Sequence, residues 1–332
     1  MLMLYIIVYS KIYKKVTIGK LLWKYKKNYC ININAWCIIM RVKKINMHKF
    51  MGVFNMKKGI IKNVIVTGLI SIMAVGLAGC GNSATKKEDT GVLDSIKESG
   101  KLVVGLSADY APYEFHIIEN GQDKIVGFDV SLAKEIADEL DVELEIKEMD
   151  FDALITALPA GKVDMVISGM NPTEKRKKAV DFSDIYYTAN HGILVRAEDA
   201  DKYTNFSDLD GLKVGAQLGS TQAELASTLI KDANLQLLSN VNNLILELKS
   251  GKVDAVVMEV GVAQMAVKNN PELAVGKPVY EETDSGNAIA IAKGNEDLVK
   301  IVNGVISRIT EDGTMNKYIE EATILSSEAV EE

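Results

Sequence analysis

Cysteine, histidine and tryptophan are all scarce in this chain, and their scarcity excludes several classes of protein. The 332 residues include three cysteines, three histidines and two tryptophans. Only Cys80 lies beyond residue 37, so the chain that follows it has no second thiol for a disulfide. The histidines show no His-x-x-x-His spacing, and no Gly-x-Ser-x-Gly motif occurs. We therefore expect no metal, no cofactor and no hydrolase.

Acidic residues are missing from the first 87 positions, which divides the chain by charge. The whole sequence carries a formal net charge of −7, but residues 80–332 hold all 45 acids against 24 lysines and arginines, a net charge of −21. Nucleic-acid binding requires clustered Lys and Arg. The acidic part therefore does not suit nucleic acid, and its self-repulsion favours a soluble monomer.

A short apolar run follows a basic segment in residues 56–80. Three lysines within 57–62 precede the uncharged run 64–77, which leads into Leu77-Ala78-Gly79-Cys80. Such a run is typical of a secretory signal peptide rather than a membrane span. Its last four residues resemble the lipobox of bacterial lipoproteins, which implies a signal peptide over 56–79 and a diacylglycerol on Cys80. We expect acyl chains such as palmitate to anchor the protein to the extracytoplasmic face of the cell membrane.

The residues on either side of this signal are expected to be unstructured. Residues 1–55 are basic and apolar, contain no acid and show no clean helical period. We interpret them as a non-native extension, with Met56 as the true start; the alternative is a membrane-associated segment. Residues 80–91 are small, polar and charged, which is typical of a flexible tether.

From residue 92 onward, strand and helix signals alternate. The run 101–106 is short and apolar, and 142–148 alternates like a strand. Apolar residues recur every three or four positions over 130–140, with Asp129 as the expected N-cap of a helix. This alternation predicts an α/β fold with mostly parallel sheets.

Two internal echoes indicate two similar lobes. Residues 161–170 and 251–260 both read Gly-Lys-Val-Asp followed by an apolar strand. KLVVGLSADY, from 101, and LKVGAQLGST, from 212, again pair a strand with a polar loop. Such repetition predicts two copies of one unit, although Gly-Lys-Val-Asp is also a common bridge from helix to strand.

The carboxyl ends of the expected strands carry small, hydroxylated and amide side chains. Ligands bind beyond the carboxyl ends of strands in open α/β sheets, so these positions form a candidate site for a small polar molecule. They are Ser107, Asp109 and Tyr110; Ser168, Gly169, Met170 and Asn171; Gln217, Ser220, Thr221 and Gln222; and Met258 and Glu259.

Three longer motifs run in order through this part of the chain. They are SADYAPYEF from 107, GFDVSLAKEIADEL from 127, and MDFDALITALPAGKVDMVISGMNPTEKRKKAVDFSDIYY from 149. Together they resemble the amino-acid family of extracytoplasmic solute-binding proteins (family 3). The resemblance covers nearly all of 92–322 and implies a two-lobed periplasmic-binding-protein-like (type II) fold with two crossover hinge strands. We place lobe 1 at 92–192 and 290–332, and lobe 2 at 193–289.

The resemblance implies roles for the residues that would hold a ligand α-carboxylate. Arg176 matches the arginine that grips this group, and a guanidinium fork suits both carboxylate oxygens. Asn171 stands where the family usually has Ser or Thr, and Gly169 lets the backbone approach closely. Ser220 and Thr221, at an expected helix start, match the second lobe's contacts with the same group.

Other positions match the rest of an amino-acid ligand. Glu259 corresponds to the acid that holds the α-ammonium, where many members carry the shorter Asp. Tyr110 and Phe151 match aromatics that sandwich the ligand, although either would also suit a hydrophobic core. Ser107 occupies a position where several binders of cationic amino acids carry Asp, which weakens a Lys, Arg or His assignment.

Nearby residues leave the side chain of the ligand open. Asp109, Glu114 and Asp150 are acids able to compensate for Ser107, and Gln217 and Gln222 offer amide contacts. The expected ligand is an amino acid with a polar neutral, sulfur-containing or cationic side chain.

These observations predict capture of an amino acid outside the cell and its delivery to the permease subunits of an ABC importer. Ligand binding would shift the protein towards closure about hinges near 192–196 and 287–293. We expect a binding protein and no enzyme. Two alternatives stay open: a cyclohexadienyl dehydratase-like enzyme on the same fold, and a sensory module, which would normally continue into a membrane helix and a signalling domain.

Overall fold

The structure is a computed structural model, and it describes residues 91–283 and 285–328. The predictions for the extension, the signal peptide, Cys80 and most of the tether concern residues that lie outside this part. Among the described helices, none combines the length and the apolar composition that crossing a bilayer requires.

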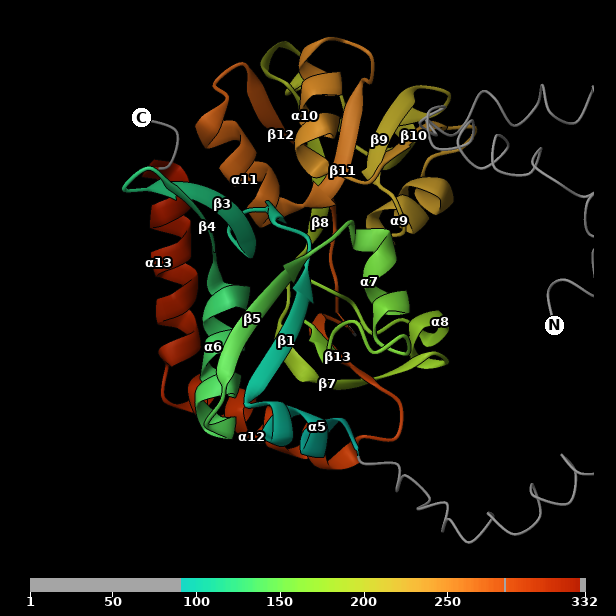
Figure 1. Ribbon diagram of the computed structural model, residues 1–332. Helices are drawn as coiled ribbons and strands as arrows, with labels where there is room; N and C mark the ends of the chain where they lie inside the picture. The colour runs from blue at the N-terminus through green and yellow to red at the C-terminus, as the bar shows by residue number, and fades with distance from the viewer. Residues whose placement is uncertain (1–90, 284, 329–332) are drawn as a thin grey trace, which may run out of the picture. The chain divides into compact units, whose positions relative to one another are not determined.

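The chain first builds one lobe, then a second, and then returns to the first (Figure 1). The first passage comprises α5 (Val92–Ser99), β1 (Lys101–Leu106), β2 (Asp109–Tyr110), β3 (Glu114–Glu119), β4 (Gln122–Val126), α6 (Phe128–Leu140), β5 (Glu143–Glu148), α7 (Phe151–Ala157), β6 (Met165–Val166), α8 (Glu174–Lys177) and β7 (Val180–Tyr187). The second lobe comprises β8 (His191–Arg196), two 3-10 helices (Ala197–Asp199 and Phe206–Leu209), β9 (Lys213–Gln217), α9 (Thr221–Leu229), β10 (Asn234–Leu238), α10 (Val241–Lys249), β11 (Ala255–Glu259), α11 (Val260–Asn269) and β12 (Leu273–Tyr280). The return adds β13 (Asn287–Ala292), α12 (Glu296–Glu311) and α13 (Thr314–Glu328).

Each lobe is built on one five-stranded sheet. The strand orders are β5-β1-β6-β13-β7 in lobe 1 and β10-β9-β11-β8-β12 in lobe 2. The strands β5, β1 and β6 run parallel, as do β10, β9 and β11, whereas β13 and β8 pair antiparallel with both of their neighbours. The predicted two-lobed α/β fold is confirmed. The sheets are mixed rather than mostly parallel, because the two strands that follow the interlobe crossings enter in the reverse direction.

The chain crosses between the lobes twice. The first crossing lies between Tyr187 and His191, and the second lies between Tyr280 and Asn287. Both are a few residues before the boundaries expected from sequence, at 192/193 and 289/290. The reason is that β8 pairs along its length with β11 and β12, and β13 pairs with β6 and β7, so each strand belongs wholly to the lobe it enters.

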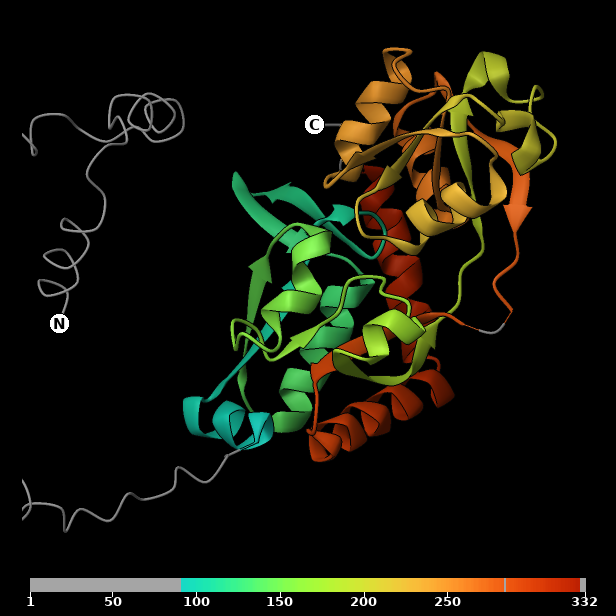
Figure 2. The ribbon, with the colours of Figure 1, turned by 90° about the vertical axis from the view of Figure 1, so that its right-hand side faces the viewer.

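The C-terminal helix α13 makes a further, non-covalent link between the lobes. It packs on α6 and α12 of lobe 1, and its end reaches α11 of lobe 2 (Figure 1; Figure 2). There the Ser326 hydroxyl donates to the Met265 sulfur at 3.1 Å, and Asn269 Nδ2 donates to the Ser326 carbonyl at 3.2 Å. The end of α13 therefore adds a contact between the lobes at a point away from the two crossings.

The start of α6 differs in detail from the sequence-based expectation. The helix carries a buried stripe that includes Leu132, Ile136 and Leu140, as its spacing predicts. Its N-cap position, however, is Gly127, and Asp129 lies inside the first turn with a fully buried side chain. The carboxylate of Asp129 therefore turns inward instead of capping its own helix.

Gly127→Ala should destabilise the protein strongly, whereas Gly304→Ala should not. A Cβ at Gly127, where φ is 134°, would lie 2.0 Å from the backbone oxygen of Tyr113, and a strained φ alone costs about 1–3 kcal/mol. A Cβ at Gly304, inside α12, meets no atom within 4 Å, and alanine is favoured there by up to about 1 kcal/mol. Urea unfolding of both variants measures the difference; equal stability of the two would contradict this account of the turn.

Candidate functional site

A small cavity lies between the lobes, at the carboxyl ends of the strands. Its volume is about 10 Å³, which is near the smallest that holds one water molecule. Nine of its ten lining residues are among the candidate site positions named from the sequence, and the tenth, Glu114, is one of the acids named beside them. The lining residues are Ser107, Asp109, Tyr110, Glu114, Phe151, Ser168, Gly169, Asn171, Gln217 and Gln222.

The hydroxyl of Tyr110 is a junction between the lobes. It accepts hydrogen bonds from Gln222 Nε2 at 3.3 Å and from the backbone N–H of Glu259 at 3.2 Å, both from lobe 2. The ring itself is buried. Tyr110 thus lines the cavity while its hydroxyl is bonded to the opposite lobe.

The guanidinium of Arg176 lies outside this cavity, in a neighbouring pocket of about 300 Å³ that Phe151 also lines, and it bridges the lobes. It follows the N-cap Thr173 in α8. Its Nη1 donates to the carbonyl of Asn171 at 2.8 Å, and its Nη2 donates to the carbonyl of Gly219 in lobe 2 at 2.9 Å. The guanidinium carbon lies 5.3 Å from the centre of the Phe151 ring, a cation–π distance. Burial lowers the pKa of Arg176 to about 10, so the group is charged at neutral pH and has only carbonyl oxygens as partners in these bonds.

The start of α9 places two hydroxyls differently. Ser220 is the N-cap: its hydroxyl accepts from the N–H of Ala223 at 3.1 Å and donates to the carbonyl of Gln217 at 2.7 Å. Thr221 instead reaches across the interface and donates to Asn171 Oδ1 at 2.9 Å. Thr221 thus lies beside Asn171 and Arg176, whereas the Ser220 hydroxyl is used within its own turn.

Glu259 is the last residue of β11, and its buried carboxyl group lies next to Tyr113. It accepts a hydrogen bond from the hydroxyl of Tyr113 and a second one from Asn287 Nδ2 at 3.3 Å. Burial raises the pKa of Glu259 to about 7. Sequence reasoning missed Tyr113 and Asn287; the position of Tyr113 within SADYAPYEF was a usable signal, whereas Asn287 had none.

Met170 and Asp150 do not reach the cavity. Met170 is fully buried in the core of lobe 1, where it packs in a cluster with Phe151, Leu154 and Val166. Asp150 is exposed, at the N-cap position of α7. Neither side chain is therefore positioned to line the cavity, although Met170 is adjacent in sequence to residues that do.

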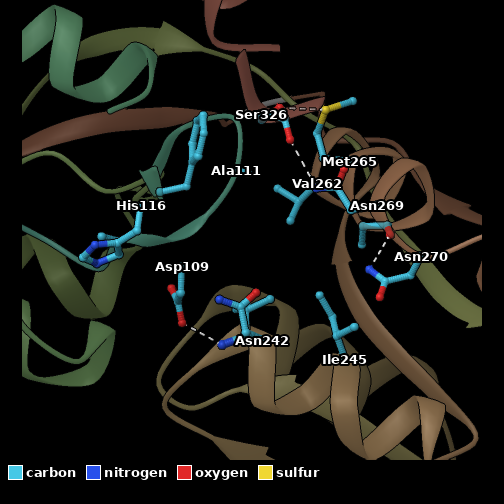
Figure 3. Close-up of a pocket in the computed structure, with 14 residues that line it drawn as sticks. Asp109, Ala111, His116, Asn242, Ile245, Val262, Met265, Asn269, Asn270 and Ser326 are labelled. Atoms are coloured by element: carbon cyan, nitrogen blue, oxygen red, sulfur yellow. Dashed lines mark hydrogen bonds between the residues drawn. The ribbon is translucent and has the colours of Figure 1, made fainter. Parts of the chain in front are cut away.

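Asp109 is an acid in the wall of the cavity, and it too joins the lobes. Its Oδ2 accepts from the N–H of Val241 at the start of α10 at 2.7 Å, and its Oδ1 accepts from Ser107 at 3.1 Å and from Gln217 Nε2 at 3.5 Å. A larger cavity of about 370 Å³ lies on its other side, between the β2–β3 hairpin, α10 and α11, and Ser326 also borders it (Figure 3). Burial raises the pKa of Asp109 to about 6.

Glu114 and Asp129 form a second acidic feature, below Ser168 and Gly169. Glu114 lines the cavity and accepts a hydrogen bond from the Ser168 hydroxyl at 2.5 Å. Burial raises the pKa of Glu114 well above its usual range, and it raises that of Asp129 to about 6. The cavity lining thus contains two acids, Asp109 and Glu114, and no basic side chain. In the part of the chain described, His, Cys, Asp and Glu form no group of three that could hold a metal ion.

Comparisons with known proteins identify relatives over the whole two-lobed body. The family model described as bacterial extracellular solute-binding proteins, family 3, matches residues 102–322. The chain is 39% identical to the arginine-binding extracellular protein ArtP of Bacillus subtilis (strain 168), over 73% of this chain and 90% of ArtP. It is 31% identical to the L-cystine-binding protein TcyJ of Escherichia coli (strain K12), over 76% of this chain and 93% of TcyJ.

Solved structures show the same two-lobed architecture. The amino acid ABC transporter substrate-binding protein AbpA from Streptococcus pneumoniae, bound to L-arginine, is 42% identical, with a TM-score of 0.69 over 70% of this chain and 98% of AbpA. Holo ArgBP from T. maritima is 40% identical, with a TM-score of 0.61 over 68% of this chain and 98% of ArgBP.

Proposed function

The chain belongs to the bacterial extracellular solute-binding proteins of family 3, and we propose that it captures a basic amino acid, with the size and charge of arginine, for an ABC importer. Relatives in the family bind amino acids such as arginine and cystine. Capture of an amino acid outside the membrane is accordingly the function of the chain. That this amino acid has a basic side chain is the more specific part of the proposal.

The charge balance of the cavity is the observation that supports a basic ligand side chain. An α-amino acid brings one ammonium and one carboxylate, and Glu259 and Arg176 are the natural partners for these two groups. Asp109 and Glu114 then remain in the cavity wall without a basic partner among the lining residues. Because a buried carboxylate is costly unless it is paired, a cationic ligand side chain supplies what these acids lack.

The contacts of Arg176, Thr221 and Phe151 indicate how such a ligand would lie. Its carboxylate would replace the carbonyl partners of Arg176, near Thr221 and Asn171, and Phe151 and Tyr110 would cover its aliphatic part. Its positive end would point towards Asp109 and Glu114. Ser107 stands where several binders of cationic amino acids carry Asp, and Asp109, two residues later, would supply the acid instead.

Arginine should bind at least about tenfold more tightly than citrulline, which differs from it only in replacing the charged guanidinium by a neutral urea. The reason is that a hydrogen bond to a charged group contributes about 1.5–3 kcal/mol, more than a neutral one. A thermal-shift screen of the twenty amino acids and L-cystine, followed by calorimetry of arginine and citrulline, measures this. Equal or tighter binding of citrulline, glutamine or cystine would overturn the basic assignment and leave the family function intact.

We propose further that the protein works as a lipid-anchored monomer that releases its ligand unchanged. The support is the lipobox-like Leu77-Ala78-Gly79-Cys80 after a basic, apolar segment, and the large negative charge of residues 80–332. A turnover assay with prephenate-like acids separates this binder from a dehydratase-like enzyme, since a binder leaves them unconverted.

A further inference from the structure

Two buried carboxyl groups face each other in lobe 1. Glu114 starts β3 and Asp129 lies in the first turn of α6, and both side chains are 0% exposed. The backbone brings them together, because Phe128 and Asp129 donate their N–H groups to the carbonyls of Pro112 and Tyr113, just before β3. The two carboxyl groups lie close enough for the charge of Asp129 to raise the pKa of Glu114.

Two of their four carboxyl oxygen atoms accept hydrogen bonds from N–H or O–H groups, and the other two do not. Glu114 Oε1 accepts from the Ser168 hydroxyl, and Asp129 Oδ2 accepts from the N–H of Gly169 and the hydroxyl of Tyr186, each at 2.9 Å. Glu114 Oε2 and Asp129 Oδ1 are fully buried and receive no hydrogen bond from an N–H or O–H group. Two carboxylates can hydrogen-bond to each other only if one of them carries a proton, so a shared proton is the simplest partner for both oxygens.

The groups that face this pair add negative charge or neutral hydroxyls. Asp109 from β2 raises the pKa of Glu114, and Asp129 in turn raises the pKa of Glu259 in β11. Tyr186 donates its hydroxyl to Asp129, and Tyr113 donates its own to Glu259; burial raises the pKa values of both hydroxyls. No basic side chain contributes to the pKa shift of either carboxyl group. Full ionisation of the pair would therefore place two uncompensated charges in a buried site.

We propose that Glu114 and Asp129 hold one proton between them at neutral pH, and that the positive end of a bound ligand's side chain displaces this proton. The second half rests on the proposed function. Glu114 is the donor, since Asp129 already accepts from two groups and is the better stabilised anion. When the cation arrives, the Glu114 O–H bond breaks, its proton leaves to the buffer, and the cation balances the new carboxylate. The site thus exchanges one positive charge for another.

The exchange makes capture of a basic ligand pH-dependent. Since binding releases a proton, a lower pH opposes binding, by up to about tenfold per pH unit once the pair is protonated. A ligand with a neutral side chain does not displace this proton. The protein would therefore hold a basic amino acid less tightly in an acidic medium, through a group that does not touch the α-carboxylate or the α-ammonium.

Proton release on L-arginine binding tests the exchange. Calorimetry at pH 7 in buffers of different ionisation enthalpy gives the number of protons released by the wild type, by Glu114→Gln and by Glu119→Gln, an exposed control on the same strand. The glutamine amide at 114 can donate permanently to Asp129 and still accept from Ser168, so this variant should fold and should release about half a proton to one proton fewer than the wild type. Glu119→Gln should match the wild type. Equal release by all three overturns the exchange.

A measurement on the free protein keeps the two proposals apart. Carbon-13 NMR of the glutamate carboxyl carbons, from pH 5 to 9, follows Glu114, whose signal is identified by its loss in Glu114→Gln. A protonated Glu114 at pH 7 supports the resident proton, even if arginine fails to bind and the basic-ligand proposal falls. An ionised Glu114 at pH 6 in the free protein overturns the resident proton, whichever ligand the protein captures.

Discussion

Replacing Arg176 by alanine should abolish measurable binding of the amino acid. The guanidinium donates to the carbonyls of Asn171 and Gly219 from opposite lobes, so a ligand carboxylate that replaced these carbonyls would pair with the guanidinium where the two lobes meet. Removing one partner of such a buried charge pair typically costs about 2–5 kcal/mol, which is a loss of roughly 30- to 5,000-fold in affinity. Isothermal titration calorimetry with the ligand found in the thermal-shift screen measures it.

Two further variants sharpen this expectation. Lys175→Ala removes an exposed charge from the same short helix and should bind like the wild type, because exposed charges contribute little. Arg176→Lys keeps the charge but not the fork that pairs with both carboxylate oxygens, so it should bind between the wild type and Arg176→Ala. Wild-type affinity in Arg176→Ala would show that the carboxylate is held elsewhere.

Glu259→Gln should weaken binding by about 2 kcal/mol or more, roughly 30-fold. The glutamine can keep the contacts to Tyr113 and Asn287, so the loss would report the missing negative charge for the α-ammonium rather than a damaged core. Glu272→Gln, which changes an exposed acid on lobe 2, is the matched control and should leave the affinity unchanged. An unchanged affinity in Glu259→Gln would remove this residue from the site.

The pH dependence of the same variant gives a second readout. Burial raises the pKa of Glu259 to about 7 before a ligand is bound, and the ammonium needs the ionised form. In the wild type the affinity should therefore fall as the pH drops from 7.5 to 5.5, by up to about tenfold per unit below the pKa. Glu259→Gln has no proton to gain at this position, so its affinity should fall less over the same interval.

The sequence was sufficient for the parts of the site that depend on local pattern. Strand ends can be read from short apolar runs, and the rule that ligands bind beyond them brought Ser107, Gln217 and Gln222 to one cavity although they lie far apart in the chain. The same rule included Met170, which failed to reach the cavity because successive residues after a strand point to opposite sides, and this one packs into the core.

The parts that the sequence did not predict depend on contacts between distant residues. The pairing of Glu114 with Asp129, and of Glu259 with Tyr113 and Asn287, requires both lobes and the small antiparallel sheet β2-β3-β4 of lobe 1 to be in place. Local periodicity also assigned Asp129 to a helix cap, since an acid before an apolar stripe is a common cap, whereas the tight turn at Gly127 moves the helix start back by two residues. Tertiary hydrogen bonds then determine what the acid does.

The contact of α13 with α11 bears on how long a complex lasts. Lobes that part by moving α11 away from α13 lose the bonds of Ser326 to Met265 and Asn269, whereas lobes that keep them must turn about an axis passing close to that corner. In either case the contact between α13 and α11 restricts the opening of the lobes that releases the ligand. Ligand entry starts from lobes that are already open. Variation at the C-terminal turn of this helix is therefore expected to alter the dissociation rate before it alters the association rate.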